Sequence, residues 1–343
     1  MNKKFLAVAI PAALFAGSVS AYDVVTSDST TVALSGEVGV KHTTTTGATE
    51  SSVNEVTGGA AVLNVNVKHS VNDSIDALGA IKFEMTSTGD DEVKATGRYF
   101  GLSFVGGEHV VKFGSVDHAG TVGLSHLKDG DDEVFPVDGS KVLRYTFTND
   151  SLTFDASHSE RAAGVDDANA TAVKAVTSFE NIEFTVGHSQ RAKFVQTGEE
   201  TDTVSGVIAE VDFAPVTLTA TYSVGATEGS KEQDDTLVKG AVDYQVNDDL
   251  ELSASYAVQD TEFKNAADTD KKTAKVGAEY VMDAWTFNAD LTDVADVSTE
   301  ALLKAEYKFT DQFKANASAK TTSFEEANKE SAGEFIVGAT LTW

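Results

Sequence analysis

Residues 333–343 read GEFIVGATLTW, and every second residue counted back from the last one is apolar. These residues are Trp343, Leu341, Ala339, Val337 and Phe335, whereas the positions between them are mostly small or polar. An alternation of period two is typical of a β-strand with two different faces, because successive side chains of a strand point to opposite sides. The whole chain nevertheless has a net charge of −28 and a mean hydropathy of −0.15. A two-faced strand in so acidic a chain raises the question of which solvent each face meets.

The opposite end of the chain has the pattern of an export signal. Residues 1–21 read MNKKFLAVAIPAALFAGSVSA, with a basic start, an apolar run from Phe5 to Ala16 and a small-residue end. This pattern predicts a secretory signal peptide that is cleaved after Ala21, and the apolar run is too short for a membrane-spanning helix. We expect residues 22–343 to form a single domain, because their strand pattern is not interrupted by a linker.

The composition excludes several classes of protein. Acidic residues outnumber basic ones by 54 to 26, which argues against a nucleic-acid partner, because phosphate binding needs clustered Lys and Arg. After the signal, no apolar run reaches the length of about eighteen residues that a transmembrane helix needs. The chain has no cysteine, so disulfides cannot stabilise it after export. Pro136 and Pro215 fall in predicted loops or turns, and so few prolines suit a chain made almost entirely of paired strands.

The alternation seen at residues 333–343 recurs from about residue 30 onward. The segments between the strands are of two alternating kinds. The short ones are mostly rich in Asn and Asp and occupy residues 71–74, 105–108, 148–151, 179–181, 213–215, 246–249, 282–284 and 310–312. The longer, polar ones include residues 43–59, 196–203 and 325–333. One rim of the sheet is therefore predicted to carry tight turns and the other long loops, and eight short turns predict eighteen strands.

Aromatic residues gather around the short turns instead of being spread along the strands. Examples are Phe104 and Phe113, Phe147 and Phe154, Tyr280 and Trp285, and Tyr307, Phe309 and Phe313. Aromatic residues at one level are typical of a membrane interface. The opposite faces carry charges of both signs, such as Lys82 with Glu84, which suits a water-filled lumen.

These observations predict an all-β fold, a transmembrane antiparallel β-barrel with short periplasmic turns and long extracellular loops. A closed barrel satisfies every backbone N–H and C=O without a free edge, as lipid requires. Alternating apolar residues would then form a continuous lipid-facing band without raising the mean hydropathy. The alternative is a soluble, secreted β-sandwich.

The chain resembles the Gram-negative general porin family. The resemblance covers essentially all of residues 22–343 and rests on VALSGEVGV (32–40), RYFGLSFVGGEHVVKFGSVD (98–117), SKVLRYTF (140–147) and FIVGATLTW (335–343). It implies an outer-membrane channel for passive diffusion of small hydrophilic solutes and ions, with no cofactor, assembled as a homotrimer. The family has sixteen strands, so we expect sixteen to eighteen, with eighteen favoured by the turns.

The resemblance also implies partners during assembly. In the family a terminal aromatic residue, usually Phe, is read by the outer-membrane assembly machinery after transport by periplasmic chaperones. In this chain the matching assembly signal consists of Phe335, Val337, Leu341 and Trp343.

The family folds its third long loop into the barrel as a constriction, and the matching loop here runs over residues 115–140. Its acidic residues are Asp117, Asp129, Asp131, Asp132, Glu133 and Asp138. In the family such acids face basic residues on the wall, which here match Lys82, Lys112 and Arg144. Val62 and Thr96 stand where further arginines are expected, and Arg98 could lie on either face. Charge at a constriction selects ions by sign, so the acidic loop favours cations.

No motif in the chain indicates catalysis. The seven histidines lack the H-E-x-x-H spacing of a zinc site, there is no G-x-S-x-G elbow, and DGDDE (129–133) lacks the spacing of a calcium loop. We therefore expect neither an enzyme nor a bound metal. Two other functions stay open: a substrate-specific channel, for instance for sugars, and a surface adhesin or receptor that acts through its acidic loops.

Overall fold

The computed structural model describes residues 22–27, 29–47, 50–58, 61–85, 93–117, 119, 138–159, 169–195, 198–229, 232–325 and 331–343. Within these residues, twenty β-strands form one antiparallel sheet, and a short 3-10 helix, η1 (Val105–Gly107), connects β6 to β7. No helix among them is long and apolar enough to cross a membrane. The predicted signal peptide, residues 1–21, lies outside the described residues.

The strands of the sheet follow one another along the chain. The first ten are β1 (Tyr22–Thr26), β2 (Thr30–Gly47), β3 (Glu50–Gly58), β4 (Ala61–Asn72), β5 (Ile75–Met85), β6 (Val93–Phe104), β7 (His109–Asp117), β8 (Asp138–Thr148), β9 (Leu152–Ser159) and β10 (Asn169–Phe179). The second ten are β11 (Ile182–Val195), β12 (Gly198–Phe213), β13 (Val216–Glu228), β14 (Gln233–Asn247), β15 (Leu250–Phe263), β16 (Thr269–Met282), β17 (Trp285–Val294), β18 (Ser298–Lys308), β19 (Phe313–Phe324) and β20 (Ala332–Thr342).

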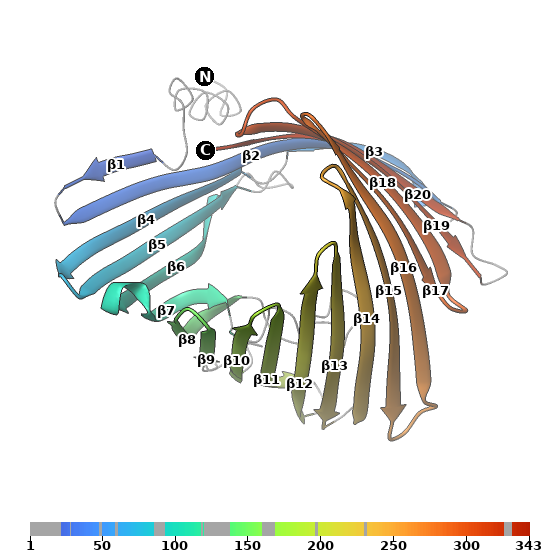
Figure 1. The fold of residues 1–343 in the computed structure, drawn as a ribbon, viewed down its shortest axis with the longest axis horizontal. Coiled ribbons are helices and arrows are strands. Elements are labelled where there is room, and N and C mark those ends of the chain that lie inside the picture. Colours follow the sequence, from blue (N-terminus) through green and yellow to red (C-terminus); the bar gives the residue numbers. More distant parts are fainter. Residues whose placement is uncertain are drawn as a thin grey trace.

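The sheet closes on itself where β20 pairs with β2 (Figure 1). On its other edge, β2 pairs through residues 30–37 with β4 and through residues 40–47 with β3, so that β3 and β4 share one strand position. Strand β1 lies beside the start of β2 and continues the line of β20. The barrel therefore has eighteen strand positions, which confirms the number predicted from the turns. One closed sheet also excludes the soluble sandwich, which needs two sheets packed face to face.

The tight turns at one rim follow from their Asn residues. The side-chain oxygen of Asn72 accepts a hydrogen bond from the backbone N–H of Ser74 at 2.9 Å. Asn149 does the same for Leu152 at 2.9 Å, and Asn247 for Leu250 at 3.0 Å. An Asn side chain that bonds to the backbone two or three residues on stabilises a turn, because it replaces a backbone partner. These predicted turns are confirmed.

The two faces of the barrel differ as the alternation predicts. Large apolar side chains such as Phe100 and Leu303 are about three-fifths exposed on the outer face, where lipid would cover them. Near the tight turns the outer face carries a row of aromatic rings in contact, some stacked and some tilted or edge-on. Neighbouring ring centroids lie 4.6–5.5 Å apart in the series Phe287, Trp285, Tyr307, Phe309 and Phe313. The predicted aromatic girdle is confirmed on this rim.

Two of the segments predicted as long loops are largely strand. Residues 43–47 belong to β2 and residues 50–58 to β3, and β12 begins at Gly198. The prediction was wrong because it relied on an apolar face. Where strands extend beyond the hydrocarbon layer, both faces meet water, so the apolar alternation disappears while the backbone ladder continues.

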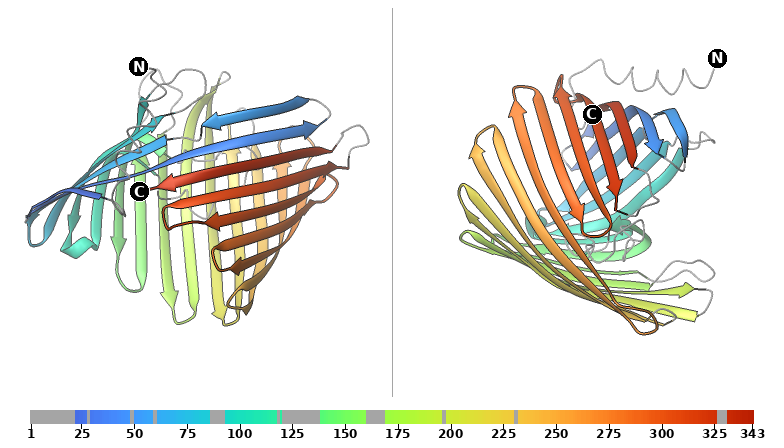
Figure 2. Two further views of the ribbon diagram at one scale, coloured as in Figure 1. Left: turned by 90° about the horizontal axis from the view of Figure 1, so that it is seen from above. Right: turned by 90° about the vertical axis from the view of Figure 1, so that its right-hand side faces the viewer.

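The seam of the barrel depends on Gly36 and Trp343. Their backbones form a reciprocal pair, in which Gly36 donates to the Trp343 carbonyl at 2.8 Å and Trp343 donates to the Gly36 carbonyl at 3.0 Å. The indole ring lies directly over Gly36, which is buried beneath it. Of the other residues in the predicted assembly signal, Phe335 and Val337 are nearly half exposed on the outer face of β20. Figure 2 shows β20 lying beside β2 along this seam.

Candidate functional site: the lumen of the barrel

The predicted constriction loop connects β7 to β8. Residues 129–133, which contain four of the six predicted acids, lie outside the described residues. Asp117 and Asp138 form the last backbone pair between β7 and β8, so the connection begins and ends at a common point. It therefore runs from residue 118 to residue 137, within the predicted span.

The chain turns toward the interior directly after β7. Ala119 is fully buried, and its backbone N–H donates a hydrogen bond to Ser157 Oγ at 2.9 Å. Ser157 is itself buried and points into the lumen from β9, because it pairs with the lumenal Arg144 of β8. This contact favours a connection that enters the barrel.

Gly114 permits this change of direction near the end of β7. Its φ of +136° lies in a region that L side chains rarely adopt. A Cβ at this position would lie 2.8 Å from the Cα of Tyr99 and closer still to the carbonyl oxygen of Arg98.

Replacing Gly114 with alanine is expected to lower the free energy of unfolding by about 2 kcal/mol or more, because the new Cβ meets backbone atoms that cannot move aside. The urea midpoint of the barrel folded in detergent measures this change. The control is Gly39→Ala, where the nearest neighbours of a Cβ would lie at 3.4 Å. Equal midpoints for the two variants would contradict the proposed role of Gly114.

The three predicted basic wall residues all face the lumen, but they do not form one cluster. Lys112 and Arg144 are direct cross-strand neighbours on β7 and β8. Lys82 lies on β5, two strands away from Lys112, opposite Gly97 of β6. All three have partners: Lys82 Nζ lies 2.5 Å from Glu84 Oε1, Arg144 Nη2 lies 3.2 Å from Asp155 Oδ1, and Lys112 Nζ lies 4.8 Å from the ring centroid of Tyr99.

The structure also places Val62 and Thr96, which stand where further arginines were expected, and Arg98, whose face was left open. Val62 lies on the lumenal face between Glu37 and Glu84. Thr96 falls at a register shift between β5 and β6, so it has no direct partner in the ladder. Arg98 pairs with Ile81, which is 43% exposed on the outer face, so Arg98 does not belong to the lumenal wall.

Two buried clusters of charged residues on the lumenal wall were not predicted from the sequence. In the first, Asp155 contacts Arg144, Thr146 and Lys174. In the second, Asp202 accepts hydrogen bonds from Arg191 at 3.2 Å and from Thr227 at 2.8 Å. The turn at residues 148–151 was a usable signal for the first cluster, because a tight hairpin sets the register that places Asp155 opposite Thr146.

The lumenal wall differs from one side of the barrel to the other. The interior face of β8 to β15 contains most of the buried polar side chains, including Ser189, Asp202 and Ser223. The interior face of β16 to β19 carries half-exposed lysines in ion pairs. These pairs are Lys275 with Asp290 at 3.1 Å, Lys314 with Glu306 at 2.8 Å and Lys320 with Glu300 at 3.3 Å. The lumen is therefore polar, and the ion pairs join cations and anions from neighbouring strands.

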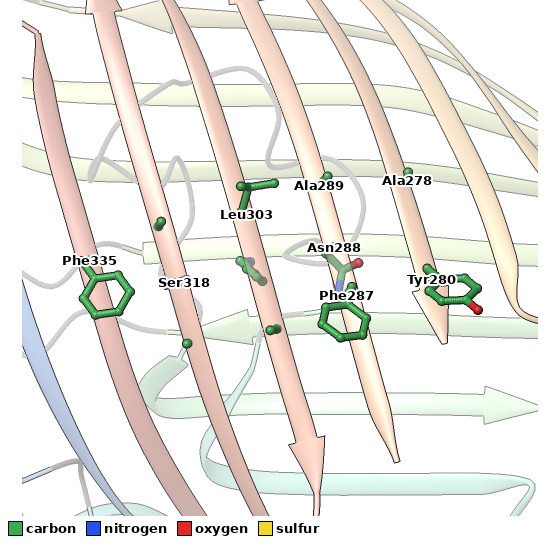
Figure 3. Close-up of a pocket in the computed structure, with 12 residues that line it drawn as sticks. Ala278, Tyr280, Phe287, Asn288, Ala289, Leu303, Ser318 and Phe335 are labelled. Atoms are coloured by element: carbon green, nitrogen blue, oxygen red, sulfur yellow. The ribbon is translucent and has the colours of Figure 1, made fainter. Parts of the chain in front are cut away.

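A groove of about 400 Å³ lies outside the lumen, on the outer face of β16 to β20 (Figure 3). Its apolar lining includes Ala317 and Ala319, and it is bordered by Tyr280, Leu303 and Phe335. The groove exists because alanines on β19 stand between larger side chains on the neighbouring strands. It lies on the outer face, and its lining is mainly apolar, although Asn288, Lys304 and Ser318 also belong to it.

No group of three or more candidate metal ligands occurs in the described part of the chain.

Comparisons with known proteins agree with the barrel. A family model described as Gram-negative porin matches residues 6–294. A search of curated proteins finds no match.

Among solved structures, OmpT of Vibrio cholerae expressed in the outer membrane has a TM-score of 0.63 and 17% identity, covering 93% of this chain and 99% of its own. An anion-selective porin from Comamonas acidovorans has a TM-score of 0.57 and 12% identity, covering 92% and 100%. OmpF of Salmonella typhi in complex with daunomycin has a TM-score of 0.59 and 12% identity, covering 93% and 99%. At these identities the structures support the fold.

Proposed function

Because the chain belongs to the Gram-negative porin family, we propose that its outer-membrane channel passes small hydrophilic solutes and ions by passive diffusion and prefers cations. The observation that carries this proposal is the polar, charge-paired lumenal wall inside a closed barrel. A lumen lined in this way holds water, and solutes pass through it without a chemical step. The proposal therefore includes no enzyme activity and no cofactor.

The distribution of aromatic residues favours diffusion over a dedicated sugar channel. A sugar channel needs aromatic rings along the lumen on which sugar rings can stack. Most large aromatic side chains lie on the outer face instead, as Phe100, Tyr222 and Tyr256 do, which are half to three-fifths exposed. Tyr99 faces the lumen, but Lys112 lies over its ring.

The preference for cations follows from a difference in charge between the lumenal wall and the connection from β7 to β8. The wall cations Lys82 and Arg144 are held in ion pairs, whereas the connection between β7 and β8 carries a strong excess of acid. We propose that this connection forms the constriction and that its fixed charge selects ions by sign. The acids in question are Asp129, Asp131, Asp132 and Glu133 in the connection, with Asp117 and Asp138 at the strand ends that flank it.

The proposal includes export and assembly. The segment 1–21 would direct export, periplasmic chaperones would carry the chain, and the outer-membrane assembly machinery would read Phe335, Val337, Leu341 and Trp343. The protein would reside in the outer-membrane lipid of a Gram-negative bacterium as a homotrimer. One solved structure with this fold, OmpT of Vibrio cholerae, is described as a trimer form.

Single-channel recording in a planar bilayer under a salt gradient tests the proposal. We expect stepwise conductance and a reversal potential that favours cations. Changing Asp129, Asp131 and Asp132 together to asparagine should reduce the cation preference, because three fixed charges leave the constriction. The control changes Asp311, an acid of the turn between β18 and β19 whose side chain is 82% exposed, to asparagine and should leave the selectivity unchanged.

Two results would contradict parts of the proposal. An anion-selective wild-type channel would mean that Lys112 and Arg144 outweigh the loop acids. A folded barrel without conductance would reject the diffusion channel and favour a surface adhesin or receptor.

A further inference from the structure

We propose that Asp155 supports the cation preference of the channel by offsetting part of the positive charge of Arg144 and Lys174 on the lumenal wall. This inference rests on the proposed channel function. Asp155 lies in the middle of β9, outside the acidic loop, and its side chain is only 4% exposed.

One carboxylate serves cations from both neighbouring strands. Asp155 Oδ1 accepts hydrogen bonds from Nε and Nη2 of Arg144 on β8, each at 3.2 Å, and from Thr146 Oγ1 at 2.5 Å. Its Oδ2 lies 3.9 Å from Lys174 Nζ on β10. Removing the carboxylate would leave two like charges facing each other across β9.

Burial gives this cluster, like that of Arg191 and Asp202, more weight than the exposed lumenal ion pairs. The side chains of Arg144 and Lys174 are 24% and 11% exposed, whereas those of Lys275 and Lys314 are 46% and 44% exposed. Water and salt screen exposed pairs strongly, but a charge in a poorly solvated site acts over a longer range. A change at Asp155 should therefore alter the lumenal potential more than a change at an exposed acid.

The position of the cluster places this potential in the path of the ions. Ser157 is the next lumen-facing residue on β9 after Asp155, and it accepts the hydrogen bond from the buried Ala119. Ala119, two residues after the end of β7, therefore lies beside the lumen-facing row of β9 that contains Asp155. Ions that move through the proposed constriction pass this part of the wall, where a buried charge is screened less by salt than an exposed one.

The test compares Asp155→Asn with Asp76→Asn in bilayer recordings under a salt gradient. Asparagine keeps the size of the side chain and can still accept the hydrogen bond from Thr146. The permeability ratio of cations to anions is expected to fall about threefold in D155N, because two wall cations lose a buried counter-charge. In D76N it should stay unchanged. Asp76 also pairs with a lumenal lysine, Lys68, at 2.9 Å, but it lies near the tight-turn rim and is 21% exposed.

A second variant guards against a folding defect in D155N. Lys174→Gln removes one cation and keeps the carboxylate, so the same permeability ratio should rise. Shifts in opposite directions for D155N and K174Q support the proposal. An unchanged reversal potential in both variants, at wild-type conductance, would overturn it while leaving the channel function intact. A wild-type barrel that does not conduct would overturn the channel function and this inference together.

Discussion

Replacing Gly36 with valine is expected to abolish the closed barrel. Gly36 lies under the indole of Trp343 at the seam, and a Cβ there would lie 2.7 Å from Cε2 of that ring and closer still to the carbonyl oxygen of Val62. The ring could move, but the backbone of β4 could not move without breaking the ladder with β2. Overpacking of this kind costs about 1–3 kcal/mol for each clash that cannot relax. We expect the decrease in the stability of the barrel to exceed that range, because the valine would disturb the pairing of β2 with both of its neighbours.

The measurement is the fraction of chains that show the heat-modifiable mobility of a folded barrel after refolding in detergent. The matched control is Gly240→Val in the middle of β14, where a Cβ would meet no atom within 4 Å. Normal folding of G36V would show that the seam tolerates side chains and that Trp343 does not need Gly36 as its platform.

Replacing Val276 with arginine is expected to destabilise the barrel by about 2–4 kcal/mol, because a charged side chain near the midplane of the bilayer must leave water. Val276 lies in the middle of β16 and is 53% exposed on the outer face. The free energy of unfolding in lipid vesicles, taken from a urea titration, measures the loss.

The control places the same side chain in the lumen. Ser253 on β15 faces inward and pairs directly with Asp243 of β14. An arginine there would remain in water beside an acid, so S253R should cost less than about 1 kcal/mol. Similar losses for V276R and S253R would contradict the assignment of the two faces.

Local regularities of the sequence were sufficient to predict most of the fold. The two-residue alternation gave the orientation of the strands, and turns such as that at Asn149 gave their number. The extension of β2 and β3 over residues 43–58 could not be predicted in this way, because in water neither face of a strand needs apolar residues. The alternation therefore predicted the strand segments that lie within the hydrocarbon layer, but not the segments that extend beyond it.

The lumenal site was harder to predict because it depends on register. Lys112 and Arg144 were recognised as lumenal from their parity, but their partners come from neighbouring strands. Asp155 is inconspicuous in LTFDASHS and becomes significant only when β9 is aligned with β8 and β10. Arg98 lies on the face given by the parity that it shares with Phe100, whereas the register shift at Thr96 lies before it and could not be predicted from the alternation.

The pairing of β2 with β20 has a consequence for the order of events in assembly. Residues 37–46 of β2 have no partner on one edge until nearly the whole chain has arrived, because the strand that pairs with them there is β20. Until then, two rows of unpaired N–H and C=O groups would be exposed, each costing several kcal/mol in hydrocarbon. A gradual insertion of strand after strand into bare lipid is therefore unfavourable. The barrel must either complete most of its ladder before it enters the membrane, or borrow a temporary strand partner at the membrane that β20 displaces at the end.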